Sequence, residues 1–230
     1  ELYLNKETCL INAMGLPGPG AERAINQILN SKLLSYNKPL GLSIGGESPE
    51  GYLETFNTYN KHIAESRYPF YYEINISCPN TEKGKHLTSN VELLEKLVKS
   101  IRGKTNRVIS VKVSPDQSDQ QLQAIAEMLS AIDCIAVNSG NTQYRSTSDV
   151  GLEKNAISYG GGGLSGAPLF KRTCEMIKLL KPFKLPIIAT GGISSKHHVQ
   201  LCLENGASLV GMATALALDP FCIPKIINEL

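Results

Sequence analysis

The segment from Asn75 to Thr81 combines residue types that could act on a planar heterocyclic substrate. It reads Asn-Ile-Ser-Cys-Pro-Asn-Thr, so that Asn75 and Asn80 flank the thiol of Cys78. Each asparagine offers a donor and an acceptor, which suits the alternating N–H and C=O edge of such a ring. Cys78 could accept a proton where a closed site tunes its pKa. A buried cysteine beside an Asx turn explains the same residues equally well.

Lys112 lies within the otherwise apolar run Val108–Val113. Burying an ammonium group is costly unless it meets an anion or strong acceptors, so a bound anionic group is one explanation. An ion pair with a carboxylate on a neighbouring strand is a second explanation. A lysine that forms a Schiff base is a third.

Gly191 and Gly192 follow the apolar run that begins at Pro186, and a helix is expected shortly after them. Glycines let backbone N–H groups approach an anion, and the N-terminus of a helix adds partial positive charge. The next apolar run leads to Thr214 in the same way. The pattern predicts a phosphate site, the alternative being two ordinary turns.

The glycine-rich run from Tyr159 to Gly166 is predicted to be a loop, close to a ligand or serving as a flexible lid or linker. Residues 141–157 before it are polar and irregular, and they are a candidate lid over a substrate. The histidines lack metal-ligand spacing, so we expect solvated positions for them and no metal site. They are His62, His86, His197 and His198.

The strands and helices that must position these residues are expected to alternate regularly along the chain. Short apolar, β-branched runs alternate with helical periodicity six times between Lys38 and the C-terminus, as parallel βαβ units require. The expected strands are 39–44, 71–76, 108–113, 133–138, 186–190 and 208–213. The expected helices are 50–65, 91–102, 118–130, 168–180 and 197–205, with a last one near the C-terminus. Residues 1–38 stand apart, with a strand at 9–12 and a helix at 22–33.

The unusual residues follow the ends of the predicted strands, which is typical of a (β/α)8 TIM barrel with its active site on one rim. Six of the eight βα units are visible. We therefore expect one α/β barrel domain over residues 1–230 that lacks the first two strands. An open, doubly wound sheet is the alternative.

Composition favours small-molecule chemistry. The 230 residues include 23 Lys and Arg against 21 Asp and Glu, and neither sign forms a block that would indicate nucleic-acid or membrane binding. The six cysteines are scattered without paired spacing, as expected in a reducing compartment. The sequence contains neither a leader pattern nor an apolar stretch of about 20 residues, so we predict a cytoplasmic location.

The motifs together resemble the dihydroorotate dehydrogenases, and their order along the chain makes the resemblance specific. The matching segments are Asn12–Pro17, Asn75–Thr81, Lys112, Asn138–Ser139, Gly162–Gly166, Gly191–Gly192 and Gly206–Leu209. The resemblance implies an FMN-binding barrel that oxidises (S)-dihydroorotate to orotate in pyrimidine synthesis. It implies that Cys78 is the base that removes a proton from carbon 5 while hydride leaves carbon 6.

The resemblance also implies the ligand contacts. Those to the substrate are Asn12, Met14, Gly15, Leu16, Asn75, Asn80, Asn138 and Ser139. Those to FMN are Asn75, Lys112, Val137, Gly166, Gly191, Gly192, Ala213 and Thr214. In this resemblance Lys112 lies beside the pyrimidine end of the flavin, where its charge would stabilise the anionic reduced ring. Gly192, Ala213 and Thr214 would surround the phosphate.

Different motifs of the chain resemble different subclasses of this family, which leaves the electron acceptor open. Cysteine as the base and the Asn12–Pro17 motif are similar to the class 1 enzymes. Ser114–Asp116 and Gly163–Gly166 are closer to class 2 or to the NAD-linked branch of class 1. The acceptor would be fumarate, a quinone or an NAD-linked subunit, and we expect a homodimer. Two rival functions are the flavin domain of dihydropyrimidine dehydrogenase and a non-catalytic barrel subunit that binds flavin or phosphate.

Overall fold

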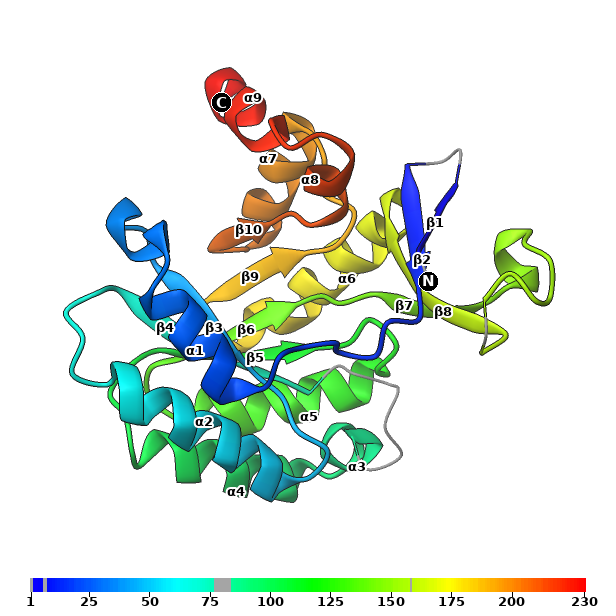
Figure 1. Ribbon diagram of the computed structural model, residues 1–230. Coiled ribbons are helices and arrows are strands. Elements are labelled where there is room, and N and C mark those ends of the chain that lie inside the picture. The colour runs from blue at the N-terminus through cyan, green and yellow to red at the C-terminus, as the bar shows by residue number, and fades with distance from the viewer. Residues whose placement is uncertain (1, 6–7, 77–83, 158) are drawn as a thin grey trace. The chain divides into compact units, whose positions relative to one another are not determined.

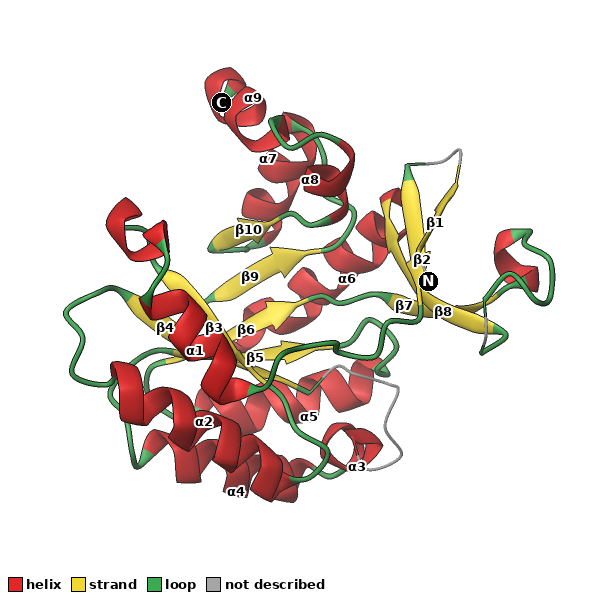
Figure 2. Cartoon of the chain, viewed as in Figure 1, coloured by secondary structure: helices red, strands yellow, loops and turns green. Residues whose placement is uncertain are grey.

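The computed structural model describes residues 2–5, 8–76, 84–157 and 159–230 (Figure 1). The chain divides into two compact units. Unit 1 comprises Glu1–Met14, Val113–Glu127 and Val137–Leu230, and unit 2 comprises Gly15–Lys112 and Met128–Ala136. Parallel strands alternate with helices in both units, as the sequence predicts for a (β/α)8-type fold (Figure 2).

Unit 2 is built on a parallel sheet in which β4 (Phe70–Asn75) pairs with β3 (Leu40–Ile44) and β5 (Ile109–Val113). Its helices are α1 (Ala21–Leu29), α2 (Pro49–Ile63), α3 (Gly84–Ser89) and α4 (Val91–Arg102). The Phe56 ring of α2 meets the Tyr72 ring of β4 edge to face, with centroids 4.9 Å apart. Both side chains are fully buried, and burial raises the pKa of Tyr72 to about 12. The apolar side chains of α2 and β4 therefore share one core.

Strand β6 (Ile135–Ser139) runs from unit 2 into unit 1. Beside its start in unit 2, the backbone N–H of Ile109 donates to the carbonyl of Cys134 at 3.0 Å. Its last residues, Val137–Ser139, pair in parallel with β9 (Ile187–Thr190) of unit 1, and β9 pairs with β10 (Leu209–Gly211). The helices that follow the strands are α5 (Asp119–Ser130), α6 (Phe170–Leu180), α7 (Lys196–Asn205), α8 (Thr214–Leu218) and α9 (Cys222–Glu229).

Unit 1 also contains an antiparallel sheet of order β1 (Leu2–Asn5), β2 (Cys9–Asn12), β8 (Gly161–Gly166) and β7 (Gln143–Ser146). A small apolar cluster lies against it, made of Cys9, Ile11, Ile157 and Leu164. The predicted strand at 9–12 is confirmed as β2. Part of the candidate lid at 141–157 is regular structure, because it contains β7 and the 3-10 helix η2 (Ser148–Val150).

The predicted loop at Tyr159–Gly166 is wrong for residues 161–166, which form β8. A β-carbon at Gly162 would lie 2.4 Å from the carbonyl oxygen of Asn12, and one at Gly163 would lie 2.1 Å from the hydroxyl of Thr142. Any larger residue would push the neighbouring segments away. The glycines are therefore required by the close approach of neighbouring segments, although a glycine-rich sequence by itself indicates flexibility.

Helix boundaries follow the capping residues that the sequence offers. Asn90 accepts a hydrogen bond from the backbone N–H of Leu93 at 3.0 Å, as expected for the cap of α4. Ser118 and Gln121 form a reciprocal capping box at the start of α5, with bonds of 3.0 and 3.2 Å. Gly206 ends α7 at φ 117°, in the left-handed region that favours glycine. These three predicted boundaries are confirmed.

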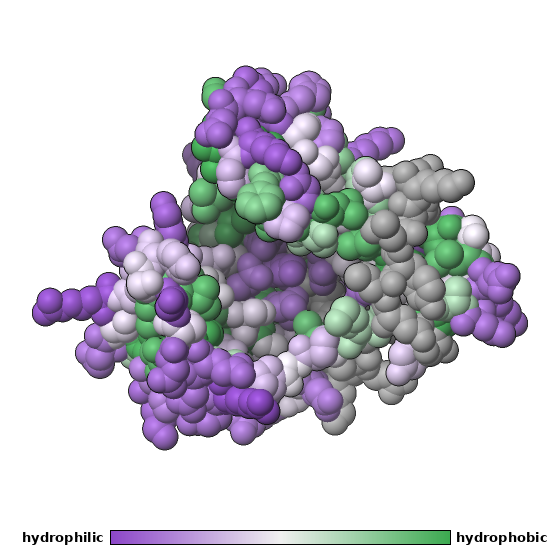
Figure 3. All heavy atoms as spheres, turned by 45° about the horizontal axis from the view of Figure 1, so that its top comes forward, coloured by the Kyte–Doolittle hydropathy of each residue, from purple (hydrophilic) through white to green (hydrophobic). Residues whose placement is uncertain are grey.

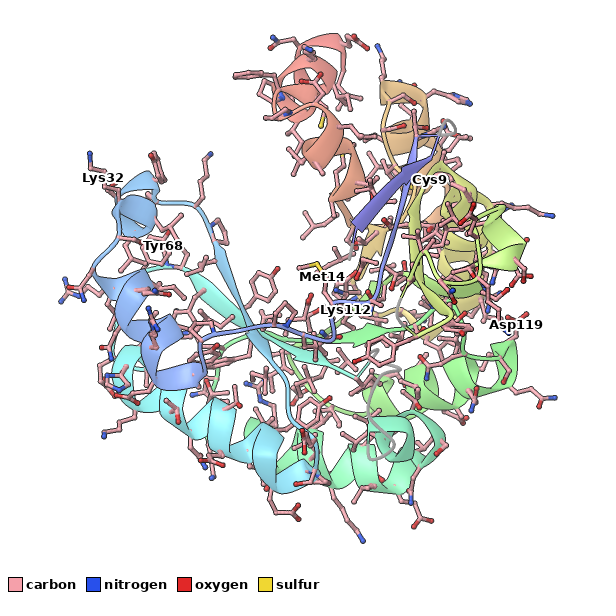
Figure 4. The ribbon with its side chains drawn as sticks, turned by 45° about the vertical axis from the view of Figure 1, so that its right-hand side comes forward. Cys9, Met14, Lys32, Tyr68, Lys112 and Asp119 are labelled. Atoms are coloured by element: carbon pink, nitrogen blue, oxygen red, sulfur yellow. The ribbon has the colours of Figure 1, made fainter. Side chains whose placement is uncertain are left out.

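The predicted helix at 22–33 is wrong at its end, because α1 stops at Leu29. Ser31 then accepts a hydrogen bond from the N–H of Leu33 at 3.2 Å and starts the 3-10 helix η1 (Lys32–Tyr36). The hydroxyl of Tyr68 donates to the carbonyls of Leu33 and Lys38 (Figure 4). The serine cap and the tyrosine hold this segment in the tighter helix.

At the C-terminal helices, the surface of unit 1 carries both hydrophilic and apolar side chains. Hydrophilic atoms cover much of α8 and α9 at the top of the space-filling view, with apolar atoms among them (Figure 3). The exposed apolar side chains there are Leu218, Phe221, Ile227 and Leu230. Within the described ranges, none of the helices combines the length and the apolar character that crossing a membrane requires.

Candidate active site

The loop after β9 is shaped by two glycines with left-handed backbone, Gly191 at φ 127° and Gly192 at φ 70°. A β-carbon at Gly192 would lie 2.6 Å from the backbone nitrogen of Phe170 and 2.8 Å from the carbonyl oxygen of Gly166. Glycine is the residue type that permits both the φ value and this approach. The loop after β9 therefore lies directly against the end of β8 and the start of α6.

A chain of hydroxyl groups extends from this place to β2. Thr214, the first residue of α8, donates to the hydroxyl of Ser165 at 2.9 Å. Ser165 donates in turn to the carbonyl of Leu10 at 3.3 Å. Ala213 precedes Thr214 at the N-cap position of α8 and provides no side-chain cap. The sequence analysis assigned no role to Ser165; the signal was a hydroxyl residue next to Gly166 in a run predicted to be irregular.

The groups around the loop after β9 suit an anion. Helix α7 begins at Lys196, and its first backbone N–H groups have no acceptors within the helix. Ser195 accepts a hydrogen bond from the N–H of His198 at 3.2 Å and so fixes the first turn. The sequence from Thr190 to His198 contains no carboxylate. Backbone donors, glycines and hydroxyls without negative charge are the groups that hold a phosphate monoester.

The end of β6 carries three of the expected ligand contacts in a buried setting. Val137 and Ser139 are fully buried, and Asn138 is 8% exposed. The Ser139 hydroxyl donates to the carbonyl of Ile188 at 3.4 Å, which leaves its lone pairs as acceptors. Gly140 follows directly, and a β-carbon there would lie 1.7 Å from the carbonyl oxygen of Thr190. The ends of β6 and β9 are thus in close backbone contact.

Asn12 lies at the end of β2 with both functions of its side-chain amide engaged. Its Nδ2 donates to the carbonyl of Gly163 at 3.4 Å, and its Oδ1 accepts from the backbone N–H of Met14 at 3.4 Å. These weak bonds orient the amide at the start of the Met14–Pro17 segment. Met14 itself is 56% exposed.

Within unit 2, the same segment continues with two successive residues at positive φ, Gly15 at 66° and Leu16 at 54°. Left-handed backbone costs a side chain such as that of Leu16 about 1–2 kcal/mol. Leu16 is half exposed, and its Cδ1 lies 3.7 Å from where a β-carbon of Gly45 would stand. Strain at positions expected to touch the substrate is consistent with a ligand-binding role.

Asn75 and Lys112 are partners across β4 and β5. Asn75 is buried, and its carbonyl accepts a hydrogen bond from the hydroxyl of Tyr52 at 2.8 Å. Lys112 is partly buried on its strand (Figure 4). In the part of the chain that the structure describes, no carboxylate lies within 4.0 Å of the Lys112 ammonium. The ion pair that the sequence analysis offered as an alternative therefore has no partner among these residues.

The loop that follows β5 is held by Arg172 of α6, which the sequence analysis did not single out. The Arg172 guanidinium donates to the carbonyls of Pro115 and Gln117 at 3.3 and 3.0 Å. It also pairs with the carboxylate of Asp119, at the start of α5, at 2.8 Å (Figure 4). In addition, the carboxylate of Asp116 accepts from the N–H of Tyr144 at 2.9 Å. These bonds tie the loop to α6 and to β7.

Two expected site residues, Cys78 and Asn80, lie outside the described residues. Among the residues that are described, no three His, Cys, Asp or Glu side chains gather as a metal site would require.

Comparisons with known proteins match nearly the whole chain. The family model for dihydroorotate dehydrogenase matches residues 2–230. The catalytic subunit of dihydroorotate dehydrogenase B (NAD(+)) from Geobacillus sp. (strain WCH70) is 32% identical over 226 residues, covering 96% of this chain and 69% of that protein. The subunit of the same name from Listeria welshimeri is 30% identical over 223 residues, with 96% and 71% covered.

A solved structure is similar in fold. The structure of DHODH from Eimeria tenella in complex with ferulenol superimposes with a TM-score of 0.80 at 20% identity. The alignment covers 97% of this chain and 67% of that one. At this level of identity the likeness supports the barrel-type fold alone.

Proposed function

Because this chain belongs to the dihydroorotate dehydrogenase family, we propose that it oxidises (S)-dihydroorotate to orotate in pyrimidine synthesis, with FMN as the hydride acceptor. The observation that carries this proposal is the family match over residues 2–230, which contains each of the quoted motifs in order. The activity and the cofactor dependence are those of the family. With it goes the proposal that residues 1–230 serve as one FMN-binding domain.

The residues present suit FMN. The glycine loop after β9 and the start of α7, which carries no carboxylate, provide donors for the phosphate, together with the hydroxyl of Thr214. Lys112 provides a positive charge on β5, and no described carboxylate lies within 4.0 Å of it. We assign Gly166, Gly192, Ala213 and Thr214 to the phosphate, and Asn75, Lys112, Val137 and Gly191 to the rest of the cofactor.

The protein's own contribution to the reaction is proton removal and substrate orientation. FMN, when bound, accepts the hydride that leaves carbon 6 of dihydroorotate. Cys78 takes the proton from carbon 5 and therefore has to be a thiolate before the reaction. The substrate is oriented by amides, by the Met14–Leu16 segment and by a hydroxyl group. The amides and the hydroxyl are those of Asn12, Asn75, Asn80, Asn138 and Ser139.

We further propose that a separate subunit carries the electrons away to NAD+. The relatives cited above are named as catalytic subunits of an NAD(+)-type enzyme, a name that implies an additional subunit. Ser114–Asp116 and Gly163–Gly166, which are closer to class 2 or to the NAD-linked branch, are compatible with this assignment. A homodimer of the catalytic subunit and a cytoplasmic location complete the proposal.

Anaerobic reduction tests the reaction. The protein as purified should be yellow, and dihydroorotate should bleach its flavin absorbance without any other reductant. Bleaching by NADPH followed by reoxidation with uracil would instead indicate the dihydropyrimidine dehydrogenase activity. A colourless protein that ignores both substrates would indicate a non-catalytic barrel. Either of these two results would overturn the proposal.

Replacing Lys112 with glutamine should slow flavin reduction by dihydroorotate by about tenfold or more, because a positive charge that stabilises the developing anionic ring is removed. Stopped-flow absorbance measures the rate, and titration against a reference dye should show a lower flavin reduction potential. Lys171→Gln is a matched control, since Lys171 is 90% exposed on α6. Equal rates in the two variants would remove Lys112 from this role.

A further inference from the structure

Glu73 of β4 lies on the face of the unit 2 sheet that carries the expected ligand contacts. Successive side chains of a strand point to opposite faces of its sheet. Tyr72 and Ile74 are fully buried, and the ring of Tyr72 meets that of Phe56 of α2. Glu73 therefore lies on the face opposite α2, together with Asn75.

The register of the sheet places Glu73 diagonally below Lys112. Glu73 pairs with Ser110 of β5, and Asn75 pairs with Lys112. Ser110 and Lys112 are two residues apart on one strand, so they share a face. Glu73 is therefore one level closer to the start of the strands than Lys112, on the same face. The two charged groups form no ion pair, because more than 4.0 Å separates them.

Tyr71, on the same face, senses the charge of Glu73. The ring of Tyr71 lies over Gly41 of β3, where a β-carbon would stand 2.6 Å from the tyrosine hydroxyl. Burial and the negative charge of Glu73 both raise the pKa of Tyr71. The carboxylate thus acts electrostatically on its neighbours on this side of the sheet.

The neighbours of Glu73 across the sheet are small hydroxyl residues, Ser43 on β3 and Ser110 on β5. The inside of a (β/α)8 barrel is usually filled by layers of bulky, branched side chains. A carboxylate between two serines departs from that pattern. On β3, β4 and β5, all of whose residues are described, the charged side chains are Glu73 and Lys112. Opposite charges therefore share the face that is expected to meet the flavin.

We propose that Glu73 helps to set the reduction potential of the bound flavin, as a negative charge that opposes Lys112. This inference rests on the proposed function, because it takes Lys112 to lie beside FMN. Reduction adds negative charge to the flavin ring, which the ammonium of Lys112 stabilises and the carboxylate of Glu73 destabilises. Glu73 thereby lowers the potential, and a flavin of lower potential passes its electrons more readily to NAD+, the acceptor proposed above.

Three variants of the whole protein isolate the charge. Glu73→Gln removes it with little change of shape, Glu73→Asp keeps it, and Glu54→Gln makes the same chemical change at an exposed residue of α2. The midpoint potential of the bound flavin is measured by equilibration with a reference dye. The dissociation constant of oxidised FMN is measured by flavin fluorescence on protein from which the flavin has been removed.

In Glu73→Gln, the equilibrium constant for flavin reduction against the dye should rise about tenfold, the order expected when one nearby charge is removed inside a protein. This rise in potential is opposite in sign to the fall expected for Lys112→Gln. The affinity for oxidised FMN should stay within about threefold of the parent, because the oxidised ring is uncharged. The equilibrium constants of Glu73→Asp and Glu54→Gln should stay within about twofold of the parent.

A readout without flavin checks the placement of the charge. On flavin-free protein, tyrosinate absorbance is titrated against pH, and the signal of Tyr71 is obtained by difference from proteins that also carry Tyr71→Phe. Tyr71 should ionise at a lower pH in Glu73→Gln than in the parent, because one of the two causes that raise its pKa is gone. Identical titrations would overturn the placement of the charge and the proposal with it.

An unchanged or lower potential in Glu73→Gln would overturn the proposal. A shift of equal size in Glu73→Asp would overturn it too, because charge would not be the cause. Weaker binding of oxidised FMN together with a lower thermal midpoint in Glu73→Gln would indicate a structural role instead. Each of these results leaves the dihydroorotate reaction standing, whereas a parent protein that binds no flavin would overturn the proposed function and this inference together.

Discussion

Replacing Cys78 with serine should slow the reduction of bound FMN by dihydroorotate by about 100-fold or more, which is the range that a positioned general base contributes. A cysteine thiol has an ordinary pKa of about 8.5, so that a modest shift yields a thiolate near neutral pH. A serine hydroxyl ionises far less readily and removes a carbon-bound proton poorly. Single-turnover stopped-flow absorbance under anaerobic conditions measures the rate directly.

The control for this variant is Cys134→Ser, which makes the same chemical change at an exposed cysteine before β6. It should reduce its flavin at the parent rate. Both variants should keep FMN, as judged by the ratio of flavin to protein absorbance. A Cys78→Ser protein that holds FMN and is reduced as fast as the control would show that another group takes the proton.

Replacing Gly192 with alanine should destabilise the protein by about 2–4 kcal/mol and release FMN. Left-handed backbone at an alanine costs about 1–2 kcal/mol, and steric overlap adds to it. The new methyl group would lie 2.6 Å from the backbone nitrogen of Phe170 and 2.8 Å from the carbonyl of Gly166. Backbone atoms cannot move aside as a flexible side chain can, so the loop after β9 has to shift. Thermal unfolding and the flavin content of the purified protein measure the two effects.

The control variant Gly151→Ala separates the cost of the left-handed backbone from the cost of steric overlap. Gly151 has φ 69°, nearly the same as Gly192, but a β-carbon there would have no atom within 4 Å. It should therefore cost only about 1 kcal/mol and leave FMN bound. Equal destabilisation in both variants, with FMN retained, would mean that the packing of Gly192 against Phe170 and Gly166 does not shape the site.

The alternation of strands and helices could be predicted from the sequence because it depends on local patterns. Apolar β-branched runs predicted β3, β4, β5, β6, β9 and β10 to within a few residues. Asn90 and Ser118 mark helix starts by bonds within one turn, and Gly206 marks an end by its own φ. The order of the motifs indicated the family, and the match over residues 2–230 confirms it.

Long-range contacts decided what the sequence could not determine. Gly161–Gly166 forms a strand because it pairs with β2 and β7, and Asn12 and Thr142 leave no space for side chains at Gly162 and Gly163. Ser165 and Arg172 contact the proposed site through bonds to Thr214 and to the loop after β5. No local pattern encodes these partners.

For Lys112 and His198 too, the sequence shows the residue type, and only the tertiary structure shows its neighbours. The apolar run around Lys112 indicated a charge that needs a partner, but the sequence could not show that no carboxylate of the described residues lies within 4.0 Å of it. The spacing of the histidines could not predict the contacts of His198, because its partners are the backbone N–H of Ser194 and the ring of Phe170. The sequence by itself determined the order of elements and the family, since period, caps and motifs are local. The tertiary structure decided how the loop after β9 is held, because that depends on which backbone atoms and rings are in contact.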